Sequence, residues 1–335
     1  MNDINPLFIH AWWRSGSTYI WSKLRGNESS ICYYEPFHER IAELSLDTIE
    51  ASPEVNRSKA LRHPIQEKNY FAEYANLIRS NELPFFPEFS YDSFLIAPEE
   101  RAEKLKSYIS KLIEAAFREQ RKAVLCFCRS QMRIAWMKNT FGGIHVAQIR
   151  NPVDQWNSFN VETYFTNKML TIALCLRKLH PLAFSHIQSF ERFAAQISKR
   201  PSLPSEELYE FFLKPRDLLD LFLVIWLAST LQSVSFCDFV LDIDLLSTSE
   251  EYRIGISDRL AMIDCPVHFS DCAIPSSEKL PIPANEFDQA IQGAANAIRH
   301  HGSSLVIADP NEIRKKMTSL SPRSSSFLLL PLGGK

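Results

Sequence analysis

Short apolar runs alternate along the chain with longer segments whose apolar positions recur at helical spacing. Residues 99–118 place apolar side chains on one face of a helix, and residues 218–233 are apolar almost throughout. Apolar strands that alternate with helices are typical of a parallel sheet covered on both faces. The pattern therefore predicts an α/β fold with a central, mostly five-stranded parallel sheet, whose strands fall within residues 6–13, 30–34, 123–128, 144–149 and 236–246.

Two long segments separate these strands. Residues 40–119 and 160–215 are expected to be helical insertions broken by prolines, and the serine-rich tail from about 318 is expected to be mobile or to dock late. The chain has 335 residues, of which 45% are hydrophobic and 23% charged. This composition fits a single domain, 1–335, with a stable core.

Charge, cysteines and apolar length narrow the class of protein. The net charge of -2 without a basic run disfavours a nucleic-acid partner. Seven cysteines without a CxxC pair disfavour a zinc site and predict reduced, mostly buried thiols. The longest apolar run, residues 221–228, is shorter than the roughly 20 residues that span a bilayer, and no secretory signal opens the sequence. We therefore expect a cytoplasmic protein without a membrane span.

The segment after the first predicted strand has the features of a phosphate loop. A helix that follows such a strand presents free N–H groups and a positive dipole end. Gly16 allows close approach to an anion, Ser17 and Thr18 add hydroxyl groups, and Arg14 adds a forked positive charge. The predicted anion-binding residues are Arg14, Ser15, Gly16, Ser17 and Thr18.

Comparison with the P-loop pattern G-x-x-x-x-G-K-S/T separates this loop from those of nucleoside triphosphatases. Gly16 and Thr18 fit the pattern, whereas Ala11 replaces the first glycine and Ser17 replaces the lysine. That lysine reaches the terminal phosphates, so a P-loop kinase-like phosphotransferase is the less favoured alternative. A polar strand–turn–helix without a ligand is the non-functional alternative.

A second candidate anion site follows the fourth predicted strand. Asn151 suits the N-cap of a helix and Pro152 its first position. Arg150 then lies at the carboxyl end of a strand, where open α/β sheets bind ligands. Ser158, two helical turns further on, lies on about the same face, so one anion can contact both side chains.

The two segments together resemble the PAPS-dependent sulfotransferase family. The loop Arg14–Thr18 resembles its 5′-phosphosulfate loop, and Arg150 with Ser158 resembles its 3′-phosphate motif. The resemblance covers residues 6–39 and 120–160. Trp226 and the run Val240–Leu245, which resembles a Tyr-Glu-Asp-Leu strand without its tyrosine, extend it more weakly.

What the resemblance implies is a three-layer, P-loop-like fold and the transfer of a sulfonate. The co-substrate would be PAPS (3′-phosphoadenosine 5′-phosphosulfate), its product PAP, and the acceptor a hydroxyl group on a glycan, a peptide tyrosine or a small molecule. The transfer needs no metal, since arginines and N–H groups meet the donor's charges. A non-catalytic PAP- or nucleotide-binding protein on the same fold is the alternative.

Three residues are candidates for catalysis besides Arg14. Glu35 lies in a Tyr-Glu-Pro run that resembles carbohydrate sulfotransferases, and it falls where tyrosylprotein sulfotransferases carry a catalytic glutamate, so it is the expected general base. The alternative for Glu35 is capping of a turn, and His38 is its rival as base. Arg129, after the third strand, is expected to stabilise charge on the sulfonate, with Arg133 as the alternative.

Other residues have a structural and a functional interpretation. Trp12 or Trp13 would stack on adenine or pack in the core. The basic triplet 314–316 would close over the 3′-phosphate or form a solvated helix face. Cys126 and Cys128 would be small buried residues on one face of a strand.

Overall fold

The computed structural model divides the chain into two compact units, each of which combines two stretches of sequence. The first unit comprises residues 1–149 and 236–275, and the second 150–235 and 276–335. The units are treated separately, and the expected single domain stays a prediction. The structure describes residues 5–50, 68–197, 206–273, 282–301, 306 and 308–332.

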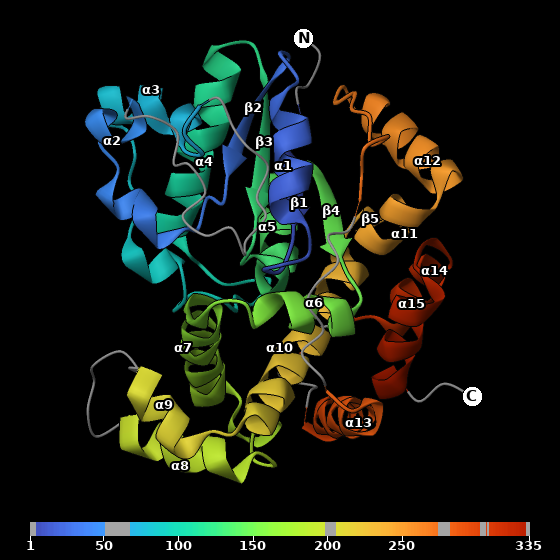
Figure 1. The fold of residues 1–335 in the computed structure, drawn as a ribbon. Coiled ribbons are helices and arrows are strands. Elements are labelled where there is room, and N and C mark those ends of the chain that lie inside the picture. Colours follow the sequence, from blue (N-terminus) through green and yellow to red (C-terminus); the bar gives the residue numbers. More distant parts are fainter. Residues whose placement is uncertain are drawn as a thin grey trace. The chain divides into compact units, whose positions relative to one another are not determined.

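The first unit holds a five-stranded, all-parallel sheet (Figure 1), as the sequence predicts. Its strand order is β2-β3-β1-β4-β5, so β1 is central and aligns Phe8 with Leu125 of β3 and His145 of β4. The strands are β1 (Leu7–His10), β2 (Ser30–Tyr34), β3 (Lys122–Phe127), β4 (Ile144–Ile149) and β5 (Phe239–Asp242).

The first strand is shorter than the sequence predicts. The predicted strand 6–13 ends at His10, and Trp12 beyond it forms an isolated antiparallel bridge with Arg129. The fifth strand lies inside the predicted range 236–246 and ends at Asp242, because the Asp242 carboxylate accepts the backbone N–H groups of Asp244 and Leu245 and starts a helix. The run Val240–Leu245 is therefore half strand and half helix.

Helices cover both faces of this sheet. The Cys32 thiol donates to the Trp21 carbonyl of α1 at 3.9 Å, whereas the hydroxyl of the next residue, Tyr33, donates to the Leu112 carbonyl of α4 at 3.1 Å. Since successive side chains of a strand point to opposite faces, α1 and α4 form separate layers. The helices of this unit are α1 (Ser17–Arg25), α2 (Leu46–Glu50), α3 (Ala75–Arg79), α4 (Glu103–Arg118), α5 (Ile134–Phe141), α11 (Ile243–Thr248) and α12 (Glu250–Ala261), with short 3-10 turns between them.

A buried chain of hydrogen bonds crosses the sheet. The Nε2 of His145 bonds the Gly142 carbonyl at 2.8 Å, its Nδ1 bonds His10 Nε2 at 2.9 Å, and His10 Nδ1 bonds the Ser130 hydroxyl at 2.7 Å. A carbonyl only accepts, so His145 Nε2 carries a proton. Burial lowers the pKa of both histidines, and with neutral rings His10 Nε2 donates to His145 Nδ1 and Ser130 donates to His10.

The described part of the second unit is built from helices: α6 (Pro152–Phe159), α7 (Thr163–Leu179), α8 (Gln188–Ile197), α9 (Glu206–Phe212), α10 (Pro215–Phe236, whose last residue is counted in the first unit), α13 (Ala284–His301), α14 (Pro310–Lys316) and α15 (Pro322–Leu329). By length and composition α10 is apolar enough to cross a membrane, but 89% of its most apolar stretch is buried in the protein, as in an ordinary core helix. The tail expected to be mobile from about 318 contains α15, whose N-cap Ser321 accepts the Ser324 N–H.

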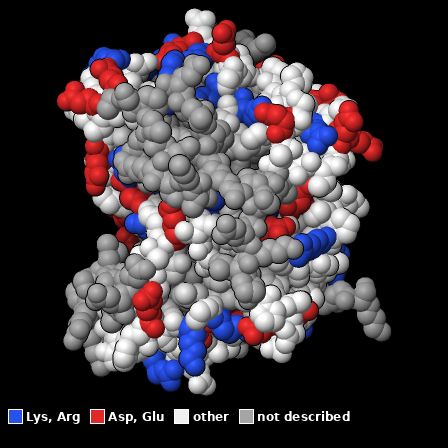
Figure 2. All heavy atoms as spheres, viewed as in Figure 1, with Lys and Arg blue, Asp and Glu red and all other residues white. Residues whose placement is uncertain are grey.

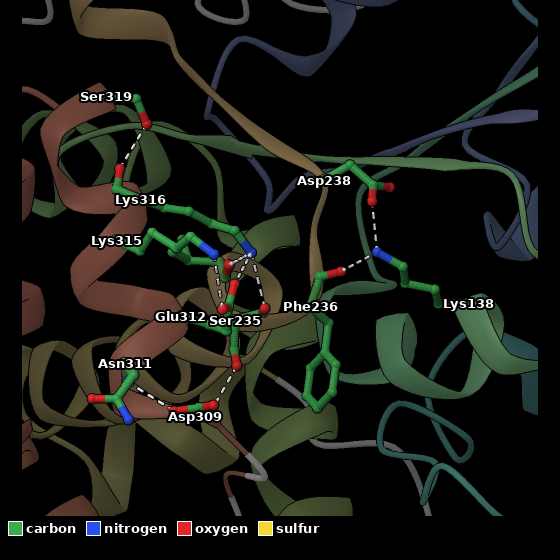
Figure 3. Close-up of polar contacts among 11 residues, drawn as sticks. Lys138, Ser235, Phe236, Asp238, Asp309, Asn311, Glu312, Lys315, Lys316 and Ser319 are labelled. Carbon is green, nitrogen blue, oxygen red and sulfur yellow. Dashed lines mark hydrogen bonds and ion pairs between the residues drawn. The ribbon is translucent and has the colours of Figure 1, made fainter.

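Lysine side chains complete the last turn of α10. Lys316 Nζ donates to the Ser235 carbonyl at 3.0 Å (Figure 3) and to the Val234 carbonyl at 2.9 Å. Within the first unit, Lys138 donates to the Phe236 carbonyl at 3.1 Å. Helix C-termini leave carbonyls without intrahelical partners, and a lysine there also favours the negative end of the dipole. Lys316 is thus a capping residue rather than part of a solvated face.

The surface drawn in Figure 2 carries charges of both signs. Blue Lys and Arg side chains lie among red Asp and Glu side chains over the described part of this face. Such mixing keeps neighbouring potentials small.

Candidate functional site

The loop between β1 and α1 has the backbone of an anion cradle. Arg14 and Gly16 both have left-handed φ angles, of 64° and 84°. A Cβ on residue 16 would lie 3.0 Å from the Ile243 side chain, so both the backbone and the space demand glycine. The first turn of α1 holds no acidic residue, and its N-cap makes no side-chain cap hydrogen bond. The first N–H groups of α1 are therefore suited to an external anion.

The hydroxyl groups of this loop have different hydrogen-bond partners. Ser15 Oγ donates to the Trp12 carbonyl at 2.7 Å, and the Ser15 carbonyl accepts from Gln148 Nε2 at 2.7 Å. Ser15, predicted as an anion-binding residue, therefore uses its hydroxyl proton to hold the loop. Ser17 Oγ lies 3.0 Å from the Cys128 thiol, and Thr18 Oγ1 lies 3.3 Å from the Tyr34 hydroxyl.

Glu35 is a buried carboxylate one residue beyond β2. Its N–H donates to the Cys126 carbonyl at 2.9 Å, and its φ of 37° turns the chain out of the strand. The N–H of His38 donates to the Glu35 carbonyl at 2.7 Å, so the backbone closes the turn and the carboxylate does not cap it. Its Oε2 makes no hydrogen bond within the described part of the chain.

Burial and a neighbouring cation act in opposite directions on the pKa of Glu35. Burial raises the pKa of Glu35, and the nearby charge of Arg129, 3.6 Å from Oε2, opposes that rise. The Cys128 thiol contacts both Glu35 and Ser17. Burial raises the pKa of Cys128, so the thiol keeps its proton. Cys128 therefore connects the carboxylate to the loop.

Arg129 is held by several acceptors beside Glu35. Its Nη1 lies 2.6 Å from Glu39 Oε2, 3.1 Å from the Phe37 carbonyl and 3.2 Å from the Tyr91 hydroxyl. Burial alone would raise the pKa of Glu39, but the charge of Arg129 overrides it and holds that pKa well below its usual range. Glu39 is therefore ionised and forms a close ion pair with Arg129.

His38, the rival base, serves the local turn. Its Nδ1 accepts the Arg40 N–H at 3.2 Å and thereby caps the 3-10 turn Glu39–Glu43. The same nitrogen lies 3.5 Å from Glu39 Oε2. The Nδ1 of His38 is therefore used by the local turn.

The two aromatic residues before the loop pack in the core. Trp12 and Trp13 are 1% and 3% exposed. Trp12 meets Phe94 edge-on at 5.6 Å, and the Arg129 guanidinium lies 5.0 Å from the Trp13 ring. Neither is positioned as an exposed stacking platform.

Arg150 and Ser158 belong to the second unit and are described within it. Arg150 is buried directly after the last residue of β4, and Ser158 lies in α6. Asn151 accepts the Asp154 N–H at 3.0 Å, and Pro152 is the first residue of α6, as predicted. The indole of Trp226 donates to Gln155 of the same helix at 3.0 Å, so Trp226 supports this turn.

Sequence reasoning missed several residues of the first unit's site. Gln148 is, beside His145, one of two polar residues in the strand β4, and that break in the apolar pattern is the signal that the sequence offers. Cys126 and Cys128 are buried, as the sequence predicts, and the contact of Cys128 with the loop is an addition that the sequence does not indicate. Glu39 and Tyr91 carried no signal, because only the folded chain brings them to Arg129.

No family model, curated protein or solved structure matches this chain. Among the described residues no group of three or more His, Cys, Asp or Glu side chains is placed to hold a metal ion. The function therefore has to be argued from the geometry of the site and the sequence motifs.

Proposed function

We propose that this protein transfers a sulfonate group from PAPS to a hydroxyl acceptor. The observation that carries the proposal is the position of Glu35. A buried carboxylate, whose Oε2 makes no hydrogen bond among the described residues and lies 3.6 Å from Arg129, connects through Cys128 to a glycine-dependent loop at the carboxyl end of a parallel sheet. Ligands of open α/β sheets bind at that end.

The donor side rests on the loop Arg14–Thr18. The N–H groups of the first turn of α1 and the Ser17 hydroxyl would hold the 5′-phosphosulfate, and Arg14 would add positive charge. The absence of an acidic residue from that turn fits a ligand of high negative charge. When bound, PAPS supplies a sulfonate attached to a phosphate leaving group.

The acceptor side rests on Glu35. In the transfer the acceptor oxygen forms a bond to sulfur while the bond between sulfur and the phosphate oxygen breaks, and the electron pair leaves with PAP. The proton of the acceptor hydroxyl moves to Glu35 Oε2. Arg129, 3.6 Å from that oxygen, keeps the carboxylate ionised in spite of its burial.

Ligand-dependent melting tests the donor. PAP should raise the melting temperature much more than AMP or ATP does, because a ligand that binds only the folded state stabilises it in proportion to RT ln(1 + [L]/Kd). Equal shifts from PAP and AMP would remove the role of the 3′-phosphate.

Mass spectrometry with labelled PAPS tests the transfer itself. A panel of glycans, tyrosine peptides and small phenols should contain at least one acceptor that gains a labelled sulfonate. Tight PAP binding with no transfer to any acceptor class would favour the non-catalytic alternative.

A further inference from the structure

Arg133 is a buried guanidinium that the chemistry above does not use. Its side chain is fully buried, and its plane lies over the Phe37 ring at 4.2 Å. Within the described residues none of its three nitrogens, Nε, Nη1 and Nη2, has a hydrogen-bond partner. Burying a charge without partners is strongly unfavourable. Such a group normally faces an anion or ordered water.

The neighbouring charges do not supply that anion. The nearest cation is Arg129, and burial together with the charge of Arg129 lowers the pKa of Arg133. The two carboxylates of the cluster, Glu39 at 2.6 Å and Glu35 at 3.6 Å, both pair with Arg129. Among the described residues, the charge of Arg133 therefore lacks a counterpart.

The contacts of Arg133 differ from those of the loop Arg14–Thr18. Cys128 contacts Ser17 of the loop, whereas Arg129 contacts Phe37 and Tyr91. Arg133 ends the 3-10 turn Gln131–Arg133 and contacts the Phe37 ring, so its surroundings are those of Arg129 and Phe37.

Further buried donors lie on segments that touch Arg129. Trp12 Nε1 and Ser90 Oγ have no hydrogen-bond partner in the part of the chain that the structure describes. Trp12 forms the backbone bridge with Arg129, and Ser90 precedes Tyr91, whose hydroxyl accepts from Arg129. Buried donors without protein partners are the groups that an oxyanion can satisfy.

We propose that Arg133 anchors a second anion site, separate from the loop Arg14–Thr18, which binds a carboxylate or a sulfate-type group. A planar guanidinium can donate two parallel hydrogen bonds to two oxygens of one carboxylate or sulfate group. The site stands on Arg133 and its surroundings, whether or not the protein transfers sulfonate. The anion is either free in solution or part of a hydroxyl compound.

Melting curves of three proteins test the site: wild type, Arg133→Met and, as the matched control for the loop, Arg14→Gln. Inorganic sulfate is compared with chloride at equal ionic strength. Sulfate should raise the melting temperature of wild type by about 2 °C or more beyond its effect on Arg133→Met, and the part of the shift that depends on Arg133 should persist in Arg14→Gln. Without sulfate, Arg133→Met should melt at least as high as wild type, because the substitution removes an unpaired buried charge. Equal sulfate shifts in all three proteins would overturn the proposal, since sulfate also stabilises proteins non-specifically.

Two further measurements complete the test. If Arg133→Met does not fold, Arg133→Gln takes its place, because glutamine keeps polarity and removes the charge. The melting-temperature shift with glycolate, compared with the shift with ethylene glycol, then identifies the source of the anion. A shift with glycolate that requires Arg133 indicates a carboxylate carried by a hydroxyl compound, and a shift with sulfate alone indicates a free inorganic oxyanion. The proposal is contradicted if glycolate raises the melting temperature of Arg133→Gln as much as that of wild type and the sulfate shift does not depend on Arg133.

Discussion

Glu35 combines burial, a neighbouring cation and an oxygen that no described group saturates. Glu35→Gln keeps the shape and removes the proton acceptor. If Glu35 is the base, turnover on a genuine acceptor should fall by about 10²- to 10⁴-fold, while PAP binding stays nearly unchanged. Turnover is measured from initial rates and PAP binding by calorimetry.

The control for this prediction is His38→Ala, which should cost far less because His38 caps a turn. A dead His38→Ala beside an active Glu35→Gln would reverse the assignment. The wild-type rate should also fall as the pH drops through the pKa of Glu35. Because burial raises that pKa, the acid side of the pH–rate profile should lie above the usual glutamate pKa of 4.5.

The histidine chain across the sheet makes stability depend on pH. Burial lowers the pKa of His10 well below 6.5, and burial lowers the pKa of His145 to about 4. The unfolded chain thus binds protons first, so the stability that these residues contribute is complete above pH 6.5 and is lost as the pH falls toward 4. The expected slope is about 1.4 kcal/mol per pH unit for each histidine.

Urea midpoints at pH 7, 6 and 5 measure that slope. His10→Gln and His145→Gln keep a hydrogen-bonding side chain that does not titrate, so each should flatten the dependence. If the urea midpoints of wild type and both variants fall by the same amount as the pH drops, groups other than these histidines control the loss of stability in acid.

At the residue scale, the position of Glu35 directly after β2 was predictable, because a strand, a carboxylate and a proline follow one another locally. Its role as base stays a prediction. The contacts of Cys128 and Gln148 with the loop were not predictable, because they join residues more than a hundred positions apart.

Helix α1 depends on the one residue before it. Gly16→Ala would force a side chain into a left-handed backbone and to within 3.0 Å of Ile243. We expect a loss of about 1–3 kcal/mol in stability and a weaker response to PAP, because the N–H groups of the loop would shift. Chemical denaturation and ligand-induced melting shifts measure the two effects.

Gly255 in α12 is the matched control for this substitution. It is exposed in the middle of a helix, and a Cβ there would meet nothing within 4 Å. Gly255→Ala should therefore stabilise by up to about 1 kcal/mol. A harmless Gly16→Ala would show that the loop does not need its left-handed turn.

Elements were easier to predict than their ends. The five strands and the helices α1, α4 and α10 follow from periodicity, since burial of a whole face leaves a long signal in the sequence. The ends of β1 and β5 depend on a backbone bridge and on a capping aspartate, and neither interaction leaves a periodic pattern.

At the scale of the molecule, Arg150 belongs to the second unit, where it directly follows β4, and its contact with the 3′-phosphate of PAP is a prediction from the sequence motif. Arg150→Ala should lose roughly 2–5 kcal/mol of PAP affinity, the usual cost of truncating one partner of a close charged pair. Affinity for adenosine 5′-phosphosulfate, which lacks the 3′-phosphate, should change little. Calorimetric titration of both ligands measures this, and parallel losses would assign Arg150 to folding or to the 5′-phosphate instead.

The order of the strands has a consequence for synthesis on the ribosome. β4 ends at Ile149, but its outer neighbour β5 begins only at Phe239, after most of the second unit has been made. Until then a nascent chain carries β4 as an open, apolar strand edge, which is a template for pairing with other chains. Premature termination between the two strands should therefore yield aggregates rather than a smaller soluble protein.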